Sequence, residues 1–153
     1  MNFAIRDLTK FEEFSQVVQV QQKIWGLNST QGLYMPMLKT MSENGGTVIG
    51  AFDADKMIGF VVGFLGRHTD GRFKLCSQTM GVLPEYRKQG IGRALLEACE
   101  QQLPTNIIHL SVRADNETAI NMYKMAGYYK IDHWVKYYND GQDAVVMEKL
   151  KLI

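Results

Sequence analysis

The sequence predicts a mixed α/β domain, because segments with helical spacing of apolar residues alternate with short runs rich in β-branched and aromatic residues. Turn signals of glycine, asparagine and aspartate separate several of these runs. The chain has 153 residues, a length that fits one domain with a sizeable core. We therefore expect a single domain over residues 1–153, with the order β-α-α-β-β-β-α-β-α-β-β.

The composition is that of an ordinary soluble globular protein. Apolar residues make up 46% and charged residues 22%, and the formal net charge is +1. No basic tail or long charge run is present, so we expect no binding to nucleic acid. The first residues hold no long apolar run, so we expect no signal peptide, no membrane anchor and a cytoplasmic location. Cys76 and Cys99 lack zinc or C-x-x-C spacing, which indicates reduced thiols and no metal.

The first half of the chain indicates a strand, two helices and a β-hairpin. Phe11, Phe14 and Val18 share one stripe of the first helix, and Gly26 is a plausible end for it. Pro36 leaves the start of the second helix open, because proline disfavours a helix interior. The expected bounds are 4–8 for the strand, 10–25 and about 32–42 for the helices, and 47–52 and 57–65 for the hairpin strands.

The second half indicates four strands and two helices. Pro104 ends the first of these helices, and Asp115 or Asn116 can cap the second. Gly127 is a plausible residue just after the end of this second helix. Residues 139–141, Asn-Asp-Gly, are typical of the turn in a last β-hairpin. The expected bounds are 73–83, 107–112, 128–138 and 144–152 for the strands, and about 90–102 and 115–127 for the helices.

The stretch from Val82 to Leu96 has the pattern of an anion-binding turn. A strand ends, a short loop follows, and Gly90 and Gly92 open a helix. The first amides of a helix lack internal partners, its dipole favours negative charge there, and glycine lets a pyrophosphate approach the backbone. The Walker pattern is absent, and Leu95 stands where a dinucleotide fingerprint needs glycine or alanine. What remains is R-x-x-G-x-G, for which the alternative is a helix start with solvated charges.

A second constellation begins at Asn116, which stands at a helix start where its amide can bond the backbone or a ligand. Tyr123 lies seven residues on, two turns along the same face. A phenol there could give a proton to a leaving group. The alternative is a core tyrosine of an amphipathic helix.

Together, the two segments resemble the GNAT superfamily of N-acyltransferases. Residues 82–96 look like its acetyl-CoA motif, and residues 116–128 look like its second motif, N-x-x-A-x-x-x-Y-x-x-x-G-[FY]. The resemblance implies a mostly antiparallel sheet that splays between the strands ending near Val82 and Val112. It also implies acetyl-CoA as co-substrate, no metal, and direct attack of an amine on the thioester, so that neither cysteine is needed.

The resemblance implies a role for each matching position. The backbone of Met80 and Val82 would bind the pantetheine arm and polarise the thioester carbonyl. Asn116 would bond the same arm, and Tyr123 would protonate the departing thiolate. The pyrophosphate would be held, mainly through amides, by Arg87, Lys88, Gln89, Gly90, Ile91, Gly92 and Arg93.

A narrower resemblance concerns the acceptor amine. Residues 110–113 and 137–147 look like protein N-terminal α-amine acetyltransferases, including the ribosomal-protein alanine type. In those enzymes the tyrosines of the last hairpin hold the peptide backbone, which implies this role for Tyr137 and Tyr138. The alternative is an exposed aromatic pair at a strand end. Tyr34 is a further acceptor-binding candidate, because it could line an apolar pocket with Trp25 and two methionines, although these side chains could equally be core.

The sequence departs from those relatives at the position of the general base, the group that would take a proton from the amine. Ser111 stands where many of them carry glutamate or histidine, and serine is a poor base without a partner. His109 lies two residues away in the strand, so it should face the same side and could help through water. The alternatives are that His109 is simply a half-buried histidine, that water alone removes the proton, or that the base lies elsewhere in the chain.

The sequence therefore favours an acetyl-CoA-dependent acetyltransferase that acts on a peptide N-terminus. Two alternatives stay open: acetylation of a small amine or a lysine, and a non-catalytic acyl-CoA-binding module. The partner is an amine acceptor, and an edge strand near the C-terminus would allow a homodimer.

Overall fold

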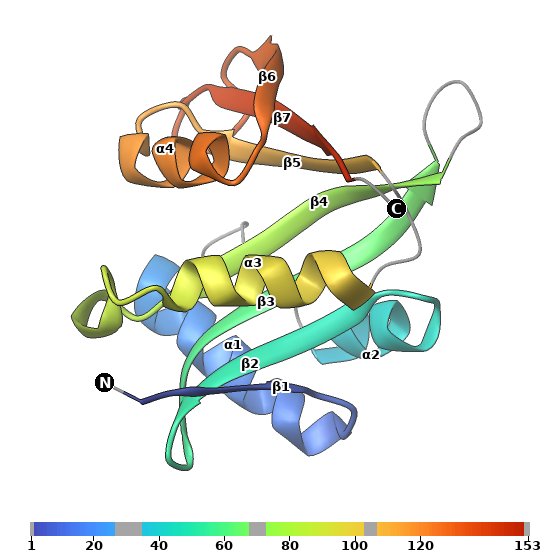
Figure 1. The fold of residues 1–153 in the computed structure, drawn as a ribbon, viewed down its shortest axis with the longest axis vertical. Helices are drawn as coiled ribbons and strands as arrows, with labels where there is room; N and C mark the ends of the chain where they lie inside the picture. The colour runs from blue at the N-terminus through green and yellow to red at the C-terminus, as the bar shows by residue number, and fades with distance from the viewer. Residues whose placement is uncertain (1, 27–34, 68–72, 103–106, 152–153) are drawn as a thin grey trace. The chain divides into compact units, whose positions relative to one another are not determined.

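The computed structural model describes residues 2–26, 35–67, 73–102 and 107–151, without the side chains of residues 65–67 and 73–78. The chain divides into two compact units (Figure 1). The first unit comprises Met1–Phe64 and Thr79–Leu103, and the second comprises Leu65–Gln78 and Pro104–Ile153. Strand β4 (Phe73–Val82) contributes its beginning to the second unit and its end to the first. The expectation of a single domain stays a prediction.

The first unit is a set of strands with helices packed on them. The strand order is β1-β2-β3-β4, and the β1–β2 and β2–β3 pairs are antiparallel. Figure 1 shows α3 across one face of these strands and α1 on the other. The elements are β1 (Ala4–Asp7), α1 (Phe11–Trp25), α2 (Met35–Glu43), β2 (Thr47–Asp53), β3 (Lys56–Arg67), the 3-10 helix η1 (Pro84–Tyr86) and α3 (Ile91–Gln102).

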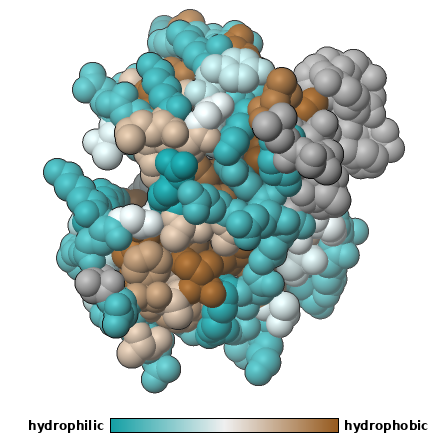
Figure 2. All heavy atoms as spheres, in the orientation of Figure 1, coloured by the Kyte–Doolittle hydropathy of each residue, from teal (hydrophilic) through white to brown (hydrophobic). Residues whose placement is uncertain are grey.

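The sequence of strand β2 does not alternate between apolar and polar residues. Residues 47–52 are all buried, because packed elements cover both faces of the strand. Phe14 of α1, Leu38 of α2 and Leu95 of α3 are among the fully buried side chains of this core. On the side seen in Figure 2, apolar surface gathers below α3, over β1 and β2.

The second unit is a small sheet with one helix. It contains β5 (Ile107–Arg113), α4 (Glu117–Met125), β6 (Tyr129–Trp134) and β7 (Ala144–Leu150), in the strand order β4-β5-β7-β6. Strand β7 pairs antiparallel with both β5 and β6, whereas β4 and β5 are parallel at Leu75 and Ile108. The splay of these two strands beyond that pair stays a prediction, as does the homodimer.

The expected element order is confirmed. The β1–β2, β2–β3, β5–β7 and β6–β7 pairs are antiparallel, and the β4–β5 pair is parallel. Asn116 caps α4 as expected, since its side chain accepts a hydrogen bond from the Ala119 N–H. Gly26 and Gly127 end their helices with φ of +87° and +99°. Pro36 lies in the first turn of α2, where its missing N–H has no cost.

The bounds of the last hairpin were wrong. Strand β6 ends at Trp134 rather than at residue 138, so Tyr137 and Tyr138 belong to the hairpin turn (residues 135–143). The physical reason is the conformation of Lys136, whose φ is +51° and whose N–H donates to the Asp143 carboxylate over 2.8 Å. That bond closes the turn before the strand can continue.

Within the described ranges, no helix combines the length and the apolar character needed to cross a membrane.

Candidate functional site

The predicted phosphate-binding turn lies in the first unit, between β4 and α3. Its 3-10 helix is fastened to the β2–β3 hairpin by Tyr86. The Tyr86 hydroxyl donates to Asp53 Oδ2 over 3.1 Å, and Lys56 Nζ lies 5.2 Å from the centre of the Tyr86 ring. The loop that precedes α3 is therefore held at one end by side chains that come from a different part of the sequence.

The start of α3 has the open geometry that an anion site needs. Gly90 has a φ of +85°, and a Cβ at this position would meet no atom within 4 Å. Its carbonyl accepts the N–H of Ala94 over 3.0 Å, so the amides of residues 91–93 precede the first amide bonded within the helix. Ile91 is buried and can offer a ligand only its amide, whereas Gln89 is exposed.

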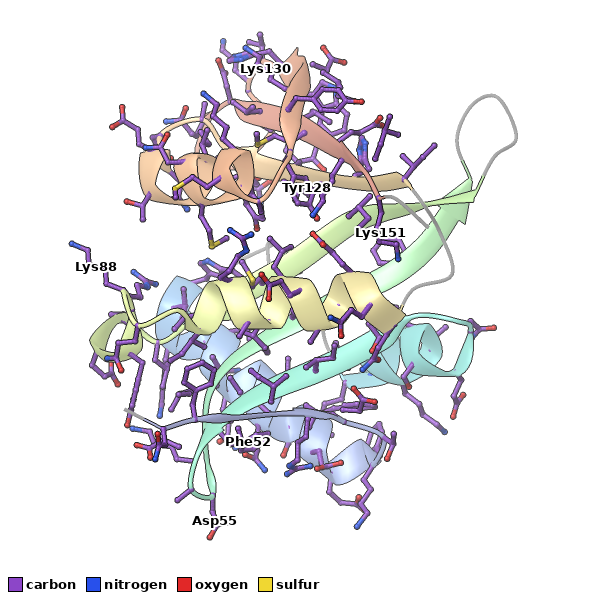
Figure 3. The ribbon with its side chains drawn as sticks, viewed as in Figure 1. Phe52, Asp55, Lys88, Tyr128, Lys130 and Lys151 are labelled. Carbon is purple, nitrogen blue, oxygen red and sulfur yellow. The ribbon has the colours of Figure 1, made fainter. Side chains whose placement is uncertain are left out.

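Three cationic side chains surround this helix start. Arg87 donates from Nε to the Val82 carbonyl over 3.0 Å, and its terminal nitrogens have no partner among the described residues. Arg93 pairs with Glu97 over 2.9 Å, one turn along the helix. Lys88 adopts a φ of +62° and extends away from the turn in Figure 3. The turn therefore combines directed amides with positive charge.

The end of β4 depends on a glycine that sequence reasoning missed. Met80 and Val82 are half-buried there. A Cβ at Gly81, between them, would come within 2.8 Å of Ile24 Cδ1 and 3.0 Å of the Phe60 ring. Only glycine lets this part of β4 lie so close to α1 and β3. The Val82 carbonyl accepts a hydrogen bond from Arg87 Nε, which ties the end of β4 to the loop before α3.

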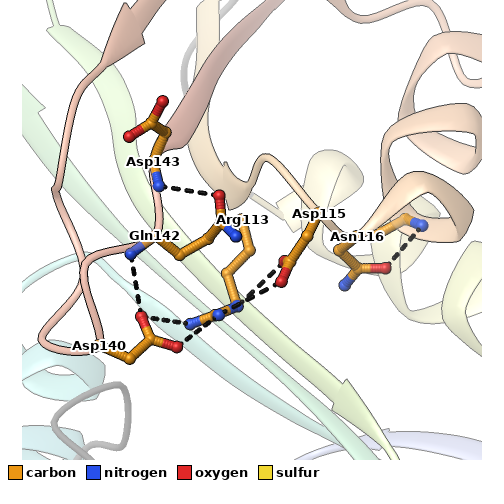
Figure 4. Close-up of polar contacts among 7 residues, drawn as sticks. Arg113, Asp115, Asn116, Asp140, Gln142 and Asp143 are labelled. Atoms are coloured by element: carbon orange, nitrogen blue, oxygen red, sulfur yellow. Dashed lines mark hydrogen bonds and ion pairs between the residues drawn. The ribbon is translucent and has the colours of Figure 1, made fainter.

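Asn116 and Tyr123 lie on α4 in the second unit. Asn116 Oδ1 accepts the Ala119 N–H over 3.2 Å, which leaves the amide NH2 as the group that can bond a ligand (Figure 4). Tyr123 is only 6% exposed, and its ring packs edge-on to Tyr128 with 5.5 Å between centroids. This burial fits a core tyrosine as well as a proton donor in a dry site.

The predicted acceptor tyrosines form part of an aromatic cluster. The ring of Tyr137 lies 5.0 Å from that of Trp134 and 5.1 Å from that of Tyr138. The Tyr138 N–H donates to the Gln142 carbonyl over 3.0 Å, which orders the turn around it. The two tyrosines are thus held by ring packing and, at Tyr138, by a backbone bond, and their role in binding an acceptor stays a prediction.

Arg113 joins the start of α4 to the hairpin turn (Figure 4). Its guanidinium donates to Asp115 over 3.2 and 3.4 Å and to Asp140 over 2.6 and 3.3 Å. It also lies 5.2 Å from the centre of the Tyr138 ring. Asp140 and then Asp115 raise the pKa of Arg113, and the hydrogen bond from Arg113 lowers the pKa of Asp140. The network therefore holds the hairpin turn through Asp140 and Tyr138.

One face of β5 carries His109, Ser111 and Arg113, which are all less buried than the residues between them. The expectation that His109 and Ser111 face the same side is therefore confirmed. Burial raises the pKa of the Tyr138 phenol, and a hydrogen bond with the Ser111 side chain opposes that rise. Ser111 thus contacts a predicted acceptor-binding tyrosine.

Glu148 of β7 belongs to the same face, and sequence reasoning missed it. It stands directly opposite His109 in the β5–β7 register, and its Oε2 lies 3.2 Å from His109 Nδ1. The signal in the sequence was a carboxylate at the end of the apolar run Ala144–Met147, although nothing local indicated its partner.

Tyr34 lies outside the described residues. Trp25, its predicted neighbour, packs edge-on to Phe60 with 6.0 Å between ring centroids, which supports the core interpretation for that side chain. Met37 is 43% exposed.

Residues 13–128 match the model of the acetyltransferase (GNAT) family. The N-alpha-acetyltransferase of Sulfurisphaera tokodaii is 32% identical over 112 residues, which cover 63% of this chain and 67% of that protein. The N-alpha-acetyltransferase RimI of Mycobacterium tuberculosis is 34% identical over 95 residues, which cover 60% of each. An uncharacterised protein of Mycobacterium leprae is matched at 38% identity over 28% of its length. The chain thus spans from 28% to 67% of the length of these three relatives.

Among solved structures, the ribosomal-protein-S18-alanine N-acetyltransferase of Escherichia coli is similar in fold. The TM-score is 0.73 at 23% identity, over 99% of this chain and 96% of that protein. At this identity the similarity concerns the fold alone.

Replacing Ser111 with alanine is expected to raise the pKa of Tyr138 further, because the lost hydrogen bond favours the phenolate. Titration of phenolate absorbance would measure the pKa of Tyr138. The same titration after adding Tyr138→Phe to the wild type and to Ser111→Ala shows which transition among the seven tyrosines belongs to Tyr138. Ser15→Ala on α1 is the matched control, since among the described residues the Ser15 hydroxyl bonds the Glu12 carbonyl. A Tyr138 transition at or below its wild-type pH in Ser111→Ala would contradict the assignment.

Proposed function

Because this chain belongs to the acetyltransferase (GNAT) family, we propose that it transfers an acetyl group from acetyl-CoA to the α-amine of a peptide N-terminus. The observation that carries the proposal is the first turn of α3. Its positive φ at Gly90, the open space there and the adjoining cations suit a pyrophosphate. Acetyl-CoA is a co-substrate that brings both the phosphates and the reactive thioester.

The chemistry is direct transfer. The amine nitrogen attacks the thioester carbonyl carbon, the C–S bond breaks, and the CoA thiolate takes up a proton. This route needs no nucleophile from the protein, in keeping with the complete burial of Cys99 within α3. The protein's contribution is to hold two reactants, polarise the carbonyl and manage protons.

Each set of residues has a distinct task in the proposal. In the first unit, Arg87, Lys88 and Arg93 supply charge for the pyrophosphate, and the amides of residues 89–93 supply donors. The backbone of Met80 and Val82 bonds the pantetheine arm. In the second unit, the Asn116 NH2 group donates to an arm carbonyl, because its oxygen is used by the helix cap. Tyr123 gives its proton to the leaving thiolate.

The hairpin turn supports a peptide as acceptor. Tyr137 is half exposed, with 50% of its surface accessible, while its ring packs on Trp134 and Tyr138. A phenol held in this way presents a hydroxyl to a peptide backbone with little loss of side-chain entropy. The named relatives are N-alpha-acetyltransferases, which supports the same acceptor class.

A second candidate is a module that binds acyl-CoA without catalysis. The observation that favours it is the burial of Tyr123 against Tyr128, which a purely structural tyrosine would also show. Acetylation of a small amine or a lysine is the third possibility, and it shares the chemistry.

The experiment that tests the proposal is thiol release from acetyl-CoA with a panel of acceptors, followed by mass spectrometry of the products. The panel holds short peptides, the same peptides with a blocked α-amine, polyamines and lysine-containing peptides. We expect acetyl on the free α-amine and no reaction with the blocked peptides that lack lysine. Reaction only with polyamines or lysine would overturn the acceptor, and CoA binding without turnover would favour the binding module.

Gly90→Glu is expected to abolish CoA binding in a calorimetric titration, because it places a carboxylate at the positive end of α3. Gly90→Ala is the matched control, since any L-residue incurs the same backbone strain at a φ of +85°. We expect Gly90→Ala to retain binding. Equal CoA affinities in the glutamate variant and the wild type would remove this turn from the phosphate site.

Tyr123→Phe is expected to lower turnover about 100-fold, as loss of a general acid does, and to leave CoA affinity nearly unchanged. Tyr128→Phe is the control, because it removes a hydroxyl from the neighbouring buried ring. Turnover of Tyr123→Phe and CoA affinity of both variants would be measured together. An undiminished turnover would exclude Tyr123 as the proton donor.

A further inference from the structure

Tyr137 and Tyr138 have to keep one position if they are to bind an acceptor peptide, although the hairpin turn that carries them lies at the surface. Fixing the backbone of a turn costs conformational entropy, and an exposed turn buries little apolar surface to offset that cost. Val135 and Tyr137 are 70% and 50% exposed, so side-chain packing holds this turn only in part. Polar interactions therefore have to hold the rest of it.

Lys136, the residue immediately before the two tyrosines, has a backbone conformation that lysine seldom adopts. Its φ is +51°, in the left-handed region, which is unfavourable for residues with a Cβ. This dihedral sets the direction in which the chain leaves Lys136, and so the direction in which Tyr137 follows. A Lys136 that relaxed to negative φ would redirect the turn, so an interaction is needed that holds the left-handed conformation.

The Asp143 carboxylate supplies that interaction and uses both of its oxygens. Oδ1 accepts the Lys136 N–H over 2.8 Å, and Oδ2 lies 2.7 Å from Nε2 of His133 in β6. The backbone of Asp143 is bonded as well, since its carbonyl accepts the Ala114 N–H over 2.9 Å. Its own N–H donates to the Gln142 side chain over 3.0 Å (Figure 4). The carboxylate therefore joins the beginning of the turn to its end from a fixed position.

The charge and the partial burial of Asp143 make these contacts strong for a surface turn. The hydrogen bond from the Lys136 N–H, and then the contact with His133, lower the pKa of the Asp143 carboxyl, so it is ionised at neutral pH. Hydrogen bonds to an ionised acceptor are about twice as strong as those between neutral groups. The Asp143 side chain is 32% exposed, against 57% for Asp140, the other carboxylate of the turn. Solvent therefore screens the contacts of Asp143 less.

We propose that Asp143 is a positioning residue for the acceptor peptide. Its carboxylate holds Lys136 in the left-handed conformation and thereby keeps Tyr137 and Tyr138 where they bind the peptide backbone. The inference rests on the proposed function. Asp143 touches neither reactant and moves no proton, so its loss weakens acceptor binding and leaves the transfer of the acetyl group intact.

The test compares Asp143→Ala and Asp143→Asn with the wild type in steady-state acetylation of one peptide. The alanine removes both oxygens, and we expect the KM for the peptide to rise about tenfold, as loss of a hydrogen bond to a charged group would cause. The kcat and the KM for acetyl-CoA are expected to stay within about twofold. The asparagine keeps an oxygen for the Lys136 N–H, so its rise is expected to be about threefold.

A general loss of folded structure would lower kcat and would not be rescued by the asparagine. An unchanged KM for the peptide in Asp143→Ala would overturn the inference, and so would a fall in kcat alone. Asp55→Ala is the matched control, because Asp55 extends from the turn between β2 and β3 in the first unit (Figure 3). We expect its constants to equal those of the wild type.

Amide hydrogen exchange tests the same inference without catalysis. The Tyr138 N–H donates to the Gln142 carbonyl and so reports the order of the turn without bonding the Asp143 side chain itself. In Asp143→Ala we expect it to exchange more than about tenfold faster, while the amides that pair β5 with β7 keep their rates. Wild-type exchange at Tyr138 in this variant would overturn the positioning role.

The wild-type protein separates this inference from the proposed function. If it acetylates no peptide α-amine, the proposed function fails, whatever the exchange at Tyr138 shows. If it acetylates peptides and Asp143→Ala keeps the wild-type KM or the wild-type exchange, only the role of Asp143 fails.

Discussion

The pairing of β7 with β5 on one edge and β6 on the other determines where every acceptor-side group of the second unit lies. In that register Glu148 stands opposite His109, Val146 opposite Ser111, and Ala144 opposite both Arg113 and Trp134. Side chains alternate between faces along a strand, so a slip of one residue would move this whole set to the other face. The slip would also carry Glu148 away from His109, to the face of β7 on which Val145 and Met147 lie.

The same pairing explains how a surface turn can be ordered. Strand β6 ends at Trp134, and the chain returns to Ala144 through a turn that contains two tyrosines. Bonds from Lys136 to Asp143 and from Arg113 to Asp140 fasten that turn at separate points. Arg113 is itself close to the cap of α4, since the Asn116 N–H donates to its carbonyl. The proposed sites for the pantetheine arm and for the peptide therefore share one polar network within the second unit.

In the first unit, close approach of backbone is the corresponding constraint. Gly81 lets the end of β4 lie against Ile24 and Phe60, and Gly90 turns the chain into α3 with a φ that other residues rarely adopt. At Gly81 the constraint is space, because a Cβ would be too close to Ile24. At Gly90 the constraint is the backbone conformation, because its φ is strained for any L-residue with a side chain. The anion-binding role that we propose for the turn rests on this backbone geometry more than on the side chains around it.

The order of elements, the helix caps and the two motifs could be predicted because each depends on neighbours within a few residues. Periodicity, Asn116 as a cap and glycine after a helix are local signals. The end of β6 could not be predicted, since it depends on Lys136 meeting a carboxylate seven residues further on. The contact of His109 with Glu148 could not be predicted either, because the two residues lie 39 positions apart in the sequence.

By itself, the sequence determined the fold class, the family and the residue types available for chemistry, because these depend on local patterns and motif spacing. Only the tertiary structure decided which of those residues meet. It placed Glu148 beside His109, Ser111 beside Tyr138, and Arg113 between two aspartates, through strand register and turn closure. Such contacts join segments far apart in the chain, and their selection depends on burying the apolar face of each strand, a property of the whole sheet and not of any one segment.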